Sequence, residues 1–180
     1  MLPIDDLFEK HPLVLVRLEL RDSAGAMIAD NFYWVAKQPE DNRGLDKFAP
    51  ASLSSALKAS TDSVVNGEKE KVWRVHLRNT GSDAAIALKL TLFHADGTRI
   101  LPAYYSDNYI SLLPGEERTV TIHAPVGAAG VGSPRVSLRG WNFPEQNVPQ
   151  DSTVLANKSK GGSEATTSAR NDVNGPAHAD

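Results

Sequence analysis

Three of the four tyrosines in this chain lie in one short stretch of sequence. Residues 102–109 read PAYYSDNY, which places Tyr104, Tyr105 and Tyr109 beside the short polar side chains of Asp107 and Asn108. Aromatic faces bind the C–H surfaces of sugars, and polar side chains accept hydrogen bonds from sugar hydroxyls. These five residues are therefore our candidate substrate-binding residues, with carbohydrate as the ligand. In the alternative interpretation the tyrosines pack in the core, and Asp107 and Asn108 form a turn.

No other group of side chains has the spacing of a known catalytic or metal site. Four histidines fall on different predicted segments: His11, His76, His94 and His123. They lack the close pairing of a metal-binding helix or loop, so we interpret them as solvated surface residues. Glu116 and Glu117 would point to opposite faces of a strand and could not flank one substrate bond, which indicates solvated charge at a turn. Nucleophile and phosphate-loop motifs are absent, so we expect no catalytic residue, no metal and no cofactor.

The composition of the 180 residues excludes several classes of protein. No cysteine is present, which excludes disulfide scaffolds, thiolate zinc sites, iron–sulfur clusters and cysteine nucleophiles. With 19 basic and 22 acidic residues the net charge is -3, so we expect neither nucleic acid nor a membrane as partner. No apolar run approaches the roughly 18 residues that cross a bilayer. The N-terminus carries Asp5, Asp6 and Glu9 where a secretory signal has positive charge, so no export signal is visible.

Most hydrophobic residues before position 144 recur with period two, the pattern of strands that bury one face. Residues 72–78 and 86–92 show it best, with the turn residues 79–83 between them. Further strands are predicted at 13–20, 27–35, 99–105, 118–123 and 134–140. Residues 52–60 fit either a strand or a helix, and their neighbourhood favours the strand. About eight strands within roughly 130 residues predict an all-β fold, an immunoglobulin-like antiparallel β-sandwich.

Composition divides the chain into three parts. Residues 144–180 contain no aromatic residue, Ile or Met and cannot bury enough apolar area to offset backbone ordering, so we expect a disordered polar tail. We expect the β-sandwich to span residues 13–143, and residues 1–12 to be a linker or the remnant of an upstream domain. The three tryptophans, Trp34, Trp73 and Trp141, are expected in the sandwich core rather than on a binding surface.

Three motifs resemble those of a known domain in their order and spacing. Residues 31–34 read NFYW, residues 105–109 read YSDNY, and residues 113–116 read LPGE. This set resembles the C-terminal immunoglobulin-like domain of family 2 glycoside hydrolases, in the exo-β-D-glucosaminidase and β-mannosidase branch. The resemblance covers roughly residues 13–143. NFYW and YSDNY are its more specific parts, because LPGE precedes strands in many β-sandwich modules.

The resemblance implies a parent enzyme whose two catalytic glutamates, an acid/base and a nucleophile, lie on a (β/α)8 barrel surrounded by β-sandwich domains. Such a barrel needs about 200–250 residues of alternating strand and helix, so this chain cannot contain it. The chain is then a fragment that lacks the catalytic barrel, and none of its glutamates matches a catalytic glutamate of the family. The implied partners are the barrel and the other β-sandwich domains of the parent, which we expect to be periplasmic or secreted.

Two functions are consistent with this reasoning. The first is a non-catalytic accessory domain that packs on the barrel of an enzyme acting on β-glucosaminides or β-mannosides, and that edges its substrate entrance with residues 104–109. The alternative is an independent carbohydrate-binding module, because the predicted fold commonly serves binding. A domain that packs on a barrel should show a contiguous apolar surface patch, whereas an autonomous module should be uniformly polar. A third function, a small autonomous hydrolase, has no motif to support it.

Overall fold

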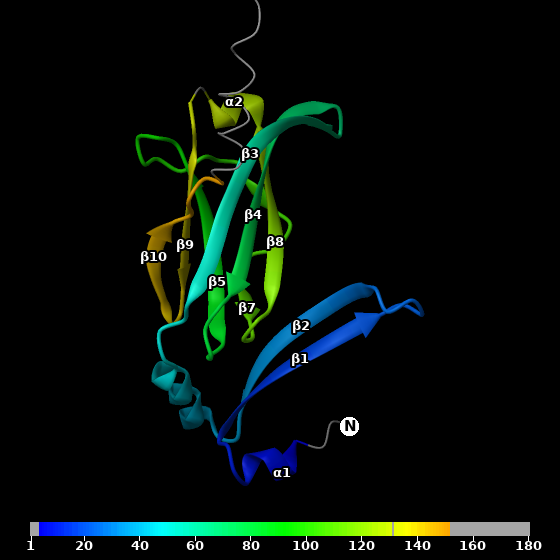
Figure 1. Cartoon of the computed structure of the whole chain (residues 1–180), viewed down its shortest axis with the longest axis vertical. Coiled ribbons are helices and arrows are strands. Elements are labelled where there is room, and N and C mark those ends of the chain that lie inside the picture. Colours follow the sequence, from blue (N-terminus) through cyan, green and yellow to red (C-terminus); the bar gives the residue numbers. More distant parts are fainter. Residues whose placement is uncertain (1–3, 131, 152–180) are drawn as a thin grey trace, which may run out of the picture.

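Two four-stranded antiparallel sheets pack face to face in this protein (Figure 1). The computed structural model describes residues 4–130 and 132–151. One sheet has the strand order β10-β9-β5-β7, and the other has the order β3-β4-β8-β6. In chain order the strands are β3 (Leu53–Val65), β4 (Glu68–Asn79), β5 (Ala85–Phe93), β6 (Tyr104–Tyr105), β7 (Ile110–Leu112), β8 (Glu117–Pro125), β9 (Arg135–Gly140) and β10 (Phe143–Asn147). The predicted immunoglobulin-like β-sandwich is confirmed.

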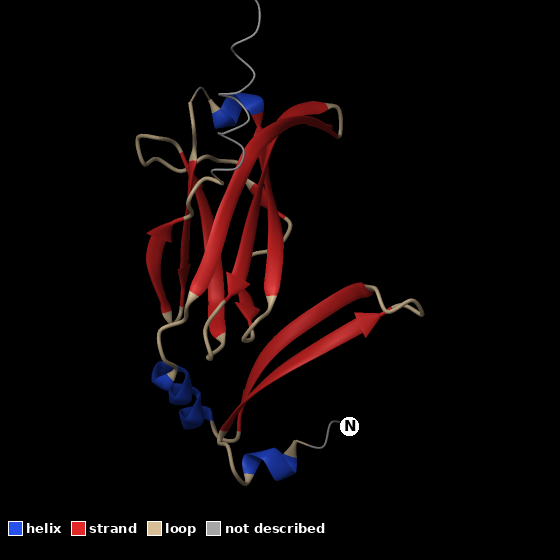
Figure 2. Cartoon of the chain, viewed as in Figure 1, coloured by secondary structure: helices blue, strands red, loops and turns tan. Residues whose placement is uncertain are grey.

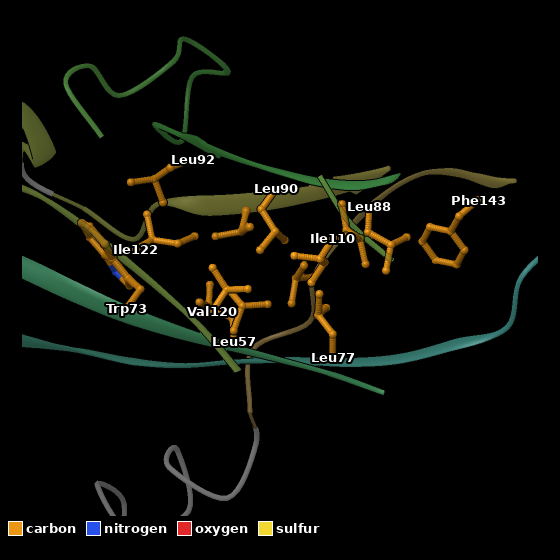
Figure 3. Close-up of a cluster of buried hydrophobic side chains, with 14 of the residues drawn as sticks. Leu57, Trp73, Leu77, Leu88, Leu90, Leu92, Ile110, Val120, Ile122 and Phe143 are labelled. Carbon is orange, nitrogen blue, oxygen red and sulfur yellow. The ribbon is translucent and has the colours of Figure 1, made fainter. Parts of the chain in front are cut away.

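The hydrophobic core lies between the two sheets and is built from the inward positions of their strands (Figure 3). In β4 the inward residues Trp73, Val75 and Leu77 are at most 2% exposed, as the period-two pattern predicts. Across the core, β5 contributes Leu90 and Leu92, which are equally buried. Each such side chain contributes about 1.5–3 kcal/mol of hydrophobic free energy. A short helix after β8, α2 (Val126–Ala129), closes one end of this core.

The ambiguous stretch at residues 52–60 forms a strand, as its neighbourhood favours. It lies within β3, which pairs with β4 from Leu53 opposite Asn79 to Val65 opposite Glu68. Leu57 is fully buried in the core, and its backbone also bonds to the C-terminal segment of the described chain. Pairing with the long neighbouring strand therefore overrides the weak helical spacing of the local sequence.

Two parts of the sequence form different elements from those predicted. Of the strand predicted at 99–105, only the two residues of β6 pair with β8, and Arg99 makes an isolated bridge to Phe93. Pro102 cannot donate a backbone hydrogen bond, so a regular ladder does not continue through this segment. The sequence pattern does not predict β7 and β10, because runs of three and five residues are too short to show a period.

The described structure continues past Phe143, where the sequence places the end of the sandwich. β10 begins at Phe143 and pairs with β9, and Val148 beyond it is only 5% exposed. The Leu57 N–H donates to the Pro149 carbonyl at 2.8 Å, and the Asp151 N–H donates to the Leu57 carbonyl at 2.9 Å. Residues 144–151 are thus held against β9 and β3. The rest of the predicted tail, residues 152–180, lies outside the described residues.

A separate two-stranded sheet precedes the sandwich, and Figure 2 shows it beside one end of the larger sheets. After the short helix α1 (Asp5–Phe8), the strands β1 (Leu13–Arg21) and β2 (Met27–Ala36) form the antiparallel hairpin that the sequence predicts. The Asp22 carboxylate closes its turn by accepting backbone hydrogen bonds from Ala24 and Ala26 at 2.9 and 2.8 Å. A 3-10 helix, η1 (Pro39–Lys47), then leads to β3. We call β1 and β2 the N-terminal hairpin.

Only one of the three tryptophans lies in the core. Trp73 is 2% exposed, but Trp34 is 43% exposed and Trp141 is 59% exposed. The prediction that all three pack in the sandwich is therefore wrong for two of them. Trp34 belongs to the N-terminal hairpin, which lies outside the sandwich, and Trp141 follows the last residue of β9 at the turn into β10.

Gly140 allows β9 to approach β5 closely. A Cβ atom at this position would lie 2.8 Å from Leu88 Cδ2 and 3.0 Å from the Ile86 carbonyl oxygen. We expect Gly140→Ala to lower the free energy of unfolding by about 1–3 kcal/mol, because the core or the backbone must shift. Urea denaturation of the isolated chain measures this loss. Gly127→Ala is the matched control, since no atom lies within 4 Å of its Cβ position, and an equal loss there would contradict the steric explanation.

Candidate functional site

The candidate segment, residues 104–109, connects β6 to β7, and two of its residues bond to the backbone of β5. The Leu92 N–H donates to the Tyr105 hydroxyl oxygen at 3.0 Å, and burial raises the pKa of Tyr105 above its ordinary value. The Asn108 side chain accepts from the Leu90 N–H at 2.8 Å and donates to the Leu90 carbonyl at 3.1 Å. These side chains continue the pairing of β5 beyond its last partner in β7. Their polar groups are therefore already used by the fold.

Tyr104 presents its ring to solvent from the edge strand β6. Tyr104 is 51% exposed, and its ring stacks on that of His123 with centroids 5.2 Å apart. The His123 Nδ1 atom lies 2.5 Å from a carboxylate oxygen of Glu70, which is 5% exposed. The interpretation of His123 as a solvated surface histidine is wrong, because it is held between an aromatic ring and a buried carboxylate.

Asp107 belongs to a network of five charged residues that joins the N-terminal hairpin to the sandwich. We call it the junction network: Arg17, Asp30, Asp107, Glu116 and Arg118. Asp30 Oδ2 accepts from Arg17 Nη1 at 2.9 Å and from Arg118 Nη2 at 2.6 Å. Arg118 Nη1 donates to Asp107 at 2.7 Å, and Arg17 Nη2 donates to Glu116 at 2.9 Å. The charges alternate along the network, so each arginine lies between two carboxylates.

The junction network is partly withdrawn from water. The side chains of Arg17 and Asp30 are 10% and 16% exposed, so their hydrogen bonds are charge-assisted and weakly screened. Glu116 also accepts a hydrogen bond from the Leu113 N–H at 2.7 Å, which makes its interpretation as solvated charge wrong. Desolvation lowers the pKa of Arg118, but hydrogen bonds to Asp30 and Asp107 more than offset it and raise this pKa overall. Arg118 therefore stays charged within the network.

Tyr109 lines a pocket with Asp107 and Arg118 of the junction network, and it also lines a hollow over β5 and β9. Its backbone is in the left-handed region with φ of 59°, and its side chain is 62% exposed. The Lys89 ammonium lies 5.2 Å from the centre of the ring, and through hydrogen bonding and its charge it lowers the pKa of Tyr109 below the ordinary value. The residues lining what we call the Tyr109–Trp141 hollow are Ala87, Lys89, Tyr109, Arg139, Gly140 and Trp141.

Two cations, Lys89 and Arg139, line this hollow together with its aromatic side chains. Lys89 and Arg139 are direct partners in the β5–β9 register, and like charges in such positions repel each other. Neither forms an ion pair with a carboxylate of the described chain. The hollow therefore combines two exposed aromatic faces with uncompensated positive charge. It suits a ligand with apolar C–H faces that carries no positive charge.

Two kinds of feature were sought among the described residues, clusters of metal ligands and membrane-spanning helices. Within 4–130 and 132–151, no group of three or more His, Asp or Glu residues could hold a metal ion. Among the same residues, no helix is long and apolar enough to span a bilayer.

Of the five candidate residues only Asp107 and Tyr109 line a common pocket, so the five do not form one binding surface. Tyr105 and Asn108 bond to β5, Asp107 joins the junction network, and Tyr104 and Tyr109 are exposed near different neighbours. Their assignment to substrate binding stays a prediction, best supported for Tyr109. Sequence reasoning did not identify Arg17 or Arg118 as partners, although each interrupts an apolar strand pattern with a charge, a signal that a buried ion pair can produce.

Residues 31–143 match the family model described as the exo-beta-D-glucosaminidase Ig-fold domain. The chain belongs to this family. The match confirms the resemblance carried by the NFYW and YSDNY motifs. This Ig-fold domain begins within β2, so it includes the loop 104–109 and the hollow but leaves out β1 with Arg17.

Curated relatives of this Ig-fold domain are much longer glycosidases. An exo-β-D-glucosaminidase of Streptomyces avermitilis is 33% identical over 157 residues, which cover 75% of this chain and 17% of the relative. A mannosylglycoprotein endo-β-mannosidase of Lilium longiflorum is 29% identical over 192 residues, covering 76% of this chain and 20% of the relative. The chain therefore spans only about a sixth to a fifth of the length of these relatives.

A solved structure supports the same fold. The exo-chitosanase of Amycolatopsis orientalis superposes with a TM-score of 0.66 at 23% identity, covering 77% of this chain and 18% of that protein. At this level of identity the similarity is one of fold.

Arg118 offers a direct test of the junction network. We expect Arg118→Met to lower the free energy of unfolding by about 1–3 kcal/mol, because the carboxylate of Asp107 loses its partner and that of Asp30 loses one of two. Urea denaturation measures the loss. Arg74→Met on the neighbouring strand β4 is the matched control, since Arg74 is exposed and should change stability by less than about 0.5 kcal/mol. Equal effects at both positions would show that the network adds no stability.

Proposed function

We propose that this chain is a non-catalytic accessory domain of a family 2 glycoside hydrolase of the exo-β-D-glucosaminidase or β-mannosidase type, packed on the catalytic barrel of its parent. The observation that carries the proposal is the match to a glycosidase Ig-fold domain, combined with a span of about a sixth of the glucosaminidase relative. A catalytic barrel of about 200–250 residues has no room in this strand-rich chain.

The distribution of exposed apolar residues supports a docking role. Large hydrophobic side chains that are at least 41% exposed gather on the N-terminal hairpin: Leu18, Leu20, Met27, Ile28, Tyr33 and Trp34. Of these, Leu18, Leu20 and Tyr33 share one face of the hairpin. Soluble domains that act alone rarely keep such an apolar face exposed, whereas domains that pack on neighbours need one. The patch matches the expectation for a domain that packs within a larger enzyme.

The exposed aromatic side chains support a position near the substrate entrance of the parent. Tyr104 and Tyr109 are 51% and 62% exposed, and hydrogen bonds of Tyr105 and Asn108 to β5 fix the loop that carries them. Rings held on a fixed loop can contact a sugar chain with little loss of conformational entropy. We therefore also propose that residues 104–109 lie at the edge of the substrate entrance of the parent enzyme.

The accessory role is tested with the isolated chain and with a chimera. In the chimera, this chain replaces the matching segment of the Streptomyces avermitilis exo-β-D-glucosaminidase. We expect no turnover of aryl β-D-glucosaminide or aryl β-mannoside by the isolated chain, turnover of the glucosaminide by the chimera, and none by the same enzyme with the segment deleted. Steady-state kinetics with each aryl glycoside measures this.

Two results would contradict this expectation. Turnover by the isolated chain that a substitution within the chain abolishes would make it an enzyme, and full activity of the deleted enzyme would remove its accessory role. The position at the entrance has its own readout. In the chimera, Tyr104→Ala should raise KM for a glucosamine oligomer about 2–10-fold and leave KM for the aryl glycoside unchanged.

A second candidate function, an independent carbohydrate-binding module, is favoured by the Tyr109–Trp141 hollow. Tyr109 and Trp141, which are 62% and 59% exposed, line this hollow with Lys89 and Arg139. Because the two cations repel protonated glucosamine, this hollow favours a neutral sugar such as mannose. The function would require no other domain, since all the lining residues belong to the sandwich.

Isothermal titration of the isolated chain separates this candidate from the accessory role. If the hollow binds sugar, mannohexaose should bind saturably and more tightly than a glucosamine hexamer, and Trp141→Ala should weaken binding about tenfold through loss of stacking. Trp34→Ala is the matched control, because Trp34 is also exposed but lies on the N-terminal hairpin. Absence of binding at millimolar sugar would reject the module function.

A further inference from the structure

We propose that the N-terminal hairpin is part of a second β-sheet whose other strands come from the portion of the parent glycosidase outside this chain. This inference rests on the proposed accessory role, because the parent supplies the partner. The inference identifies the N-terminal hairpin as the element that contacts the parent, and a β-sheet of the parent as the structure that covers it.

The two faces of the hairpin have different chemistry. Arg17 and Asp30 project from one face to bond with Glu116 and Arg118 of the sandwich. Because successive side chains of a strand point to opposite faces, their neighbours form the other face. That outer face consists of Val14, Val16, Leu18 and Leu20 on β1 and of Ala29, Asn31, Tyr33 and Val35 on β2. Only Asn31 among these eight is neither aliphatic nor aromatic.

The outer face is uncovered over much of its length. Leu18 is 41% exposed, Leu20 is 59% exposed and Tyr33 is 47% exposed. Exposed apolar area is unfavourable by about 25 cal/mol per Å² relative to buried area, so a covering layer would stabilise the hairpin. A two-stranded hairpin alone is also marginal in water, and three strands or a packed face are usually needed.

The edges of the hairpin are open as well. Among residues 4–130 and 132–151, β1 and β2 form a sheet of their own, and no backbone hydrogen bond joins them to another strand. Neither strand contains Lys or Pro, two residues that commonly protect a free edge from pairing, and the charges of Arg17 and Asp30 are paired within the junction network. The register shift between Leu20 and Arg21 is confined to the turn end. Such an unprotected edge suits a strand that normally has a neighbour.

A sheet from the parent accounts for both features together. Added strands would pair with the open edges, and the layer behind them would cover the apolar outer face. The matched Ig-fold domain begins at Asn31, so β1 and the start of β2 lie outside it. Since this chain covers only 17% of the Streptomyces avermitilis relative, most of that polypeptide is available to supply such strands. The junction network then fixes how the second sheet is oriented against the sandwich.

Amide hydrogen exchange tests the inference. In the isolated chain, peptides from β1 and β2 should exchange much faster than those from β4. In the active chimera defined above, the same β1 and β2 peptides should exchange at least about tenfold more slowly, because their edges are paired. Unchanged exchange in an active chimera would overturn the inference while leaving the accessory role intact. An inactive, unfolded chimera would overturn both.

Substitutions on the outer face give an independent readout. Leu18→Asp should lower the melting temperature of the chimera but leave that of the isolated chain unchanged, because only the chimera buries this side chain. Val64→Asp is the matched control, since Val64 is 67% exposed on β3 and should change neither. If the isolated chain is a dimer whose hairpin is already protected, and Leu18→Asp dissociates it, a second copy covers the face and the inference is wrong.

Discussion

One carboxylate oxygen of Asp30 accepts hydrogen bonds from two arginines, and the position of the hairpin on the sandwich depends on it. Arg17 comes from β1 and Arg118 from β8, so two cations from different sheets share this one acceptor. The register of the hairpin is tied to the same contact. Arg17 lies opposite Phe32, which places it diagonally beside Asp30 on one face. A slip of one residue between the strands would place Arg17 and Asp30 on opposite faces of the hairpin, so the network also specifies the strand pairing.

The pairing of β5 imposes a second constraint, because its neighbour β7 is short. Beyond β7, side chains supply the acceptors for the β5 backbone: Asn108 accepts from Leu90, and Tyr105 accepts from Leu92. Near the other end, the Asn142 side chain accepts from the Ile86 N–H at 3.0 Å. Buried backbone donors need partners wherever a ladder is interrupted. The tyrosine-rich segment therefore has a structural role in closing the sheet, and its exposed rings depend on that role for their position.

Much of the fold could be predicted from period-two hydrophobicity, because that pattern reports directly which side of a strand is buried. Trp73, Val75 and Leu77 lie in the core for this reason. Contacts that cross between distant segments leave no such local pattern. Arg17 and Glu116 are 99 positions apart in the sequence, and the residues around either one give no signal that predicts the pair. Trp141 is exposed because it lies in the turn between β9 and β10. The prediction placed it in the core because it considered only the residue type.

The two open surfaces of this domain differ in chemistry, and the difference indicates different kinds of contact. The outer face of the hairpin is apolar and carries no charge, as in permanent interfaces that resemble a divided core. The Tyr109–Trp141 hollow combines aromatic rings with two cations, and such a mixed polar surface is typical of reversible contacts. None of the residues that line the hollow belongs to the hairpin, although Tyr109 also lines a pocket with Asn31 and Phe32 of β2. An accessory domain of a glycosidase can therefore be fixed to its parent and still contact sugar.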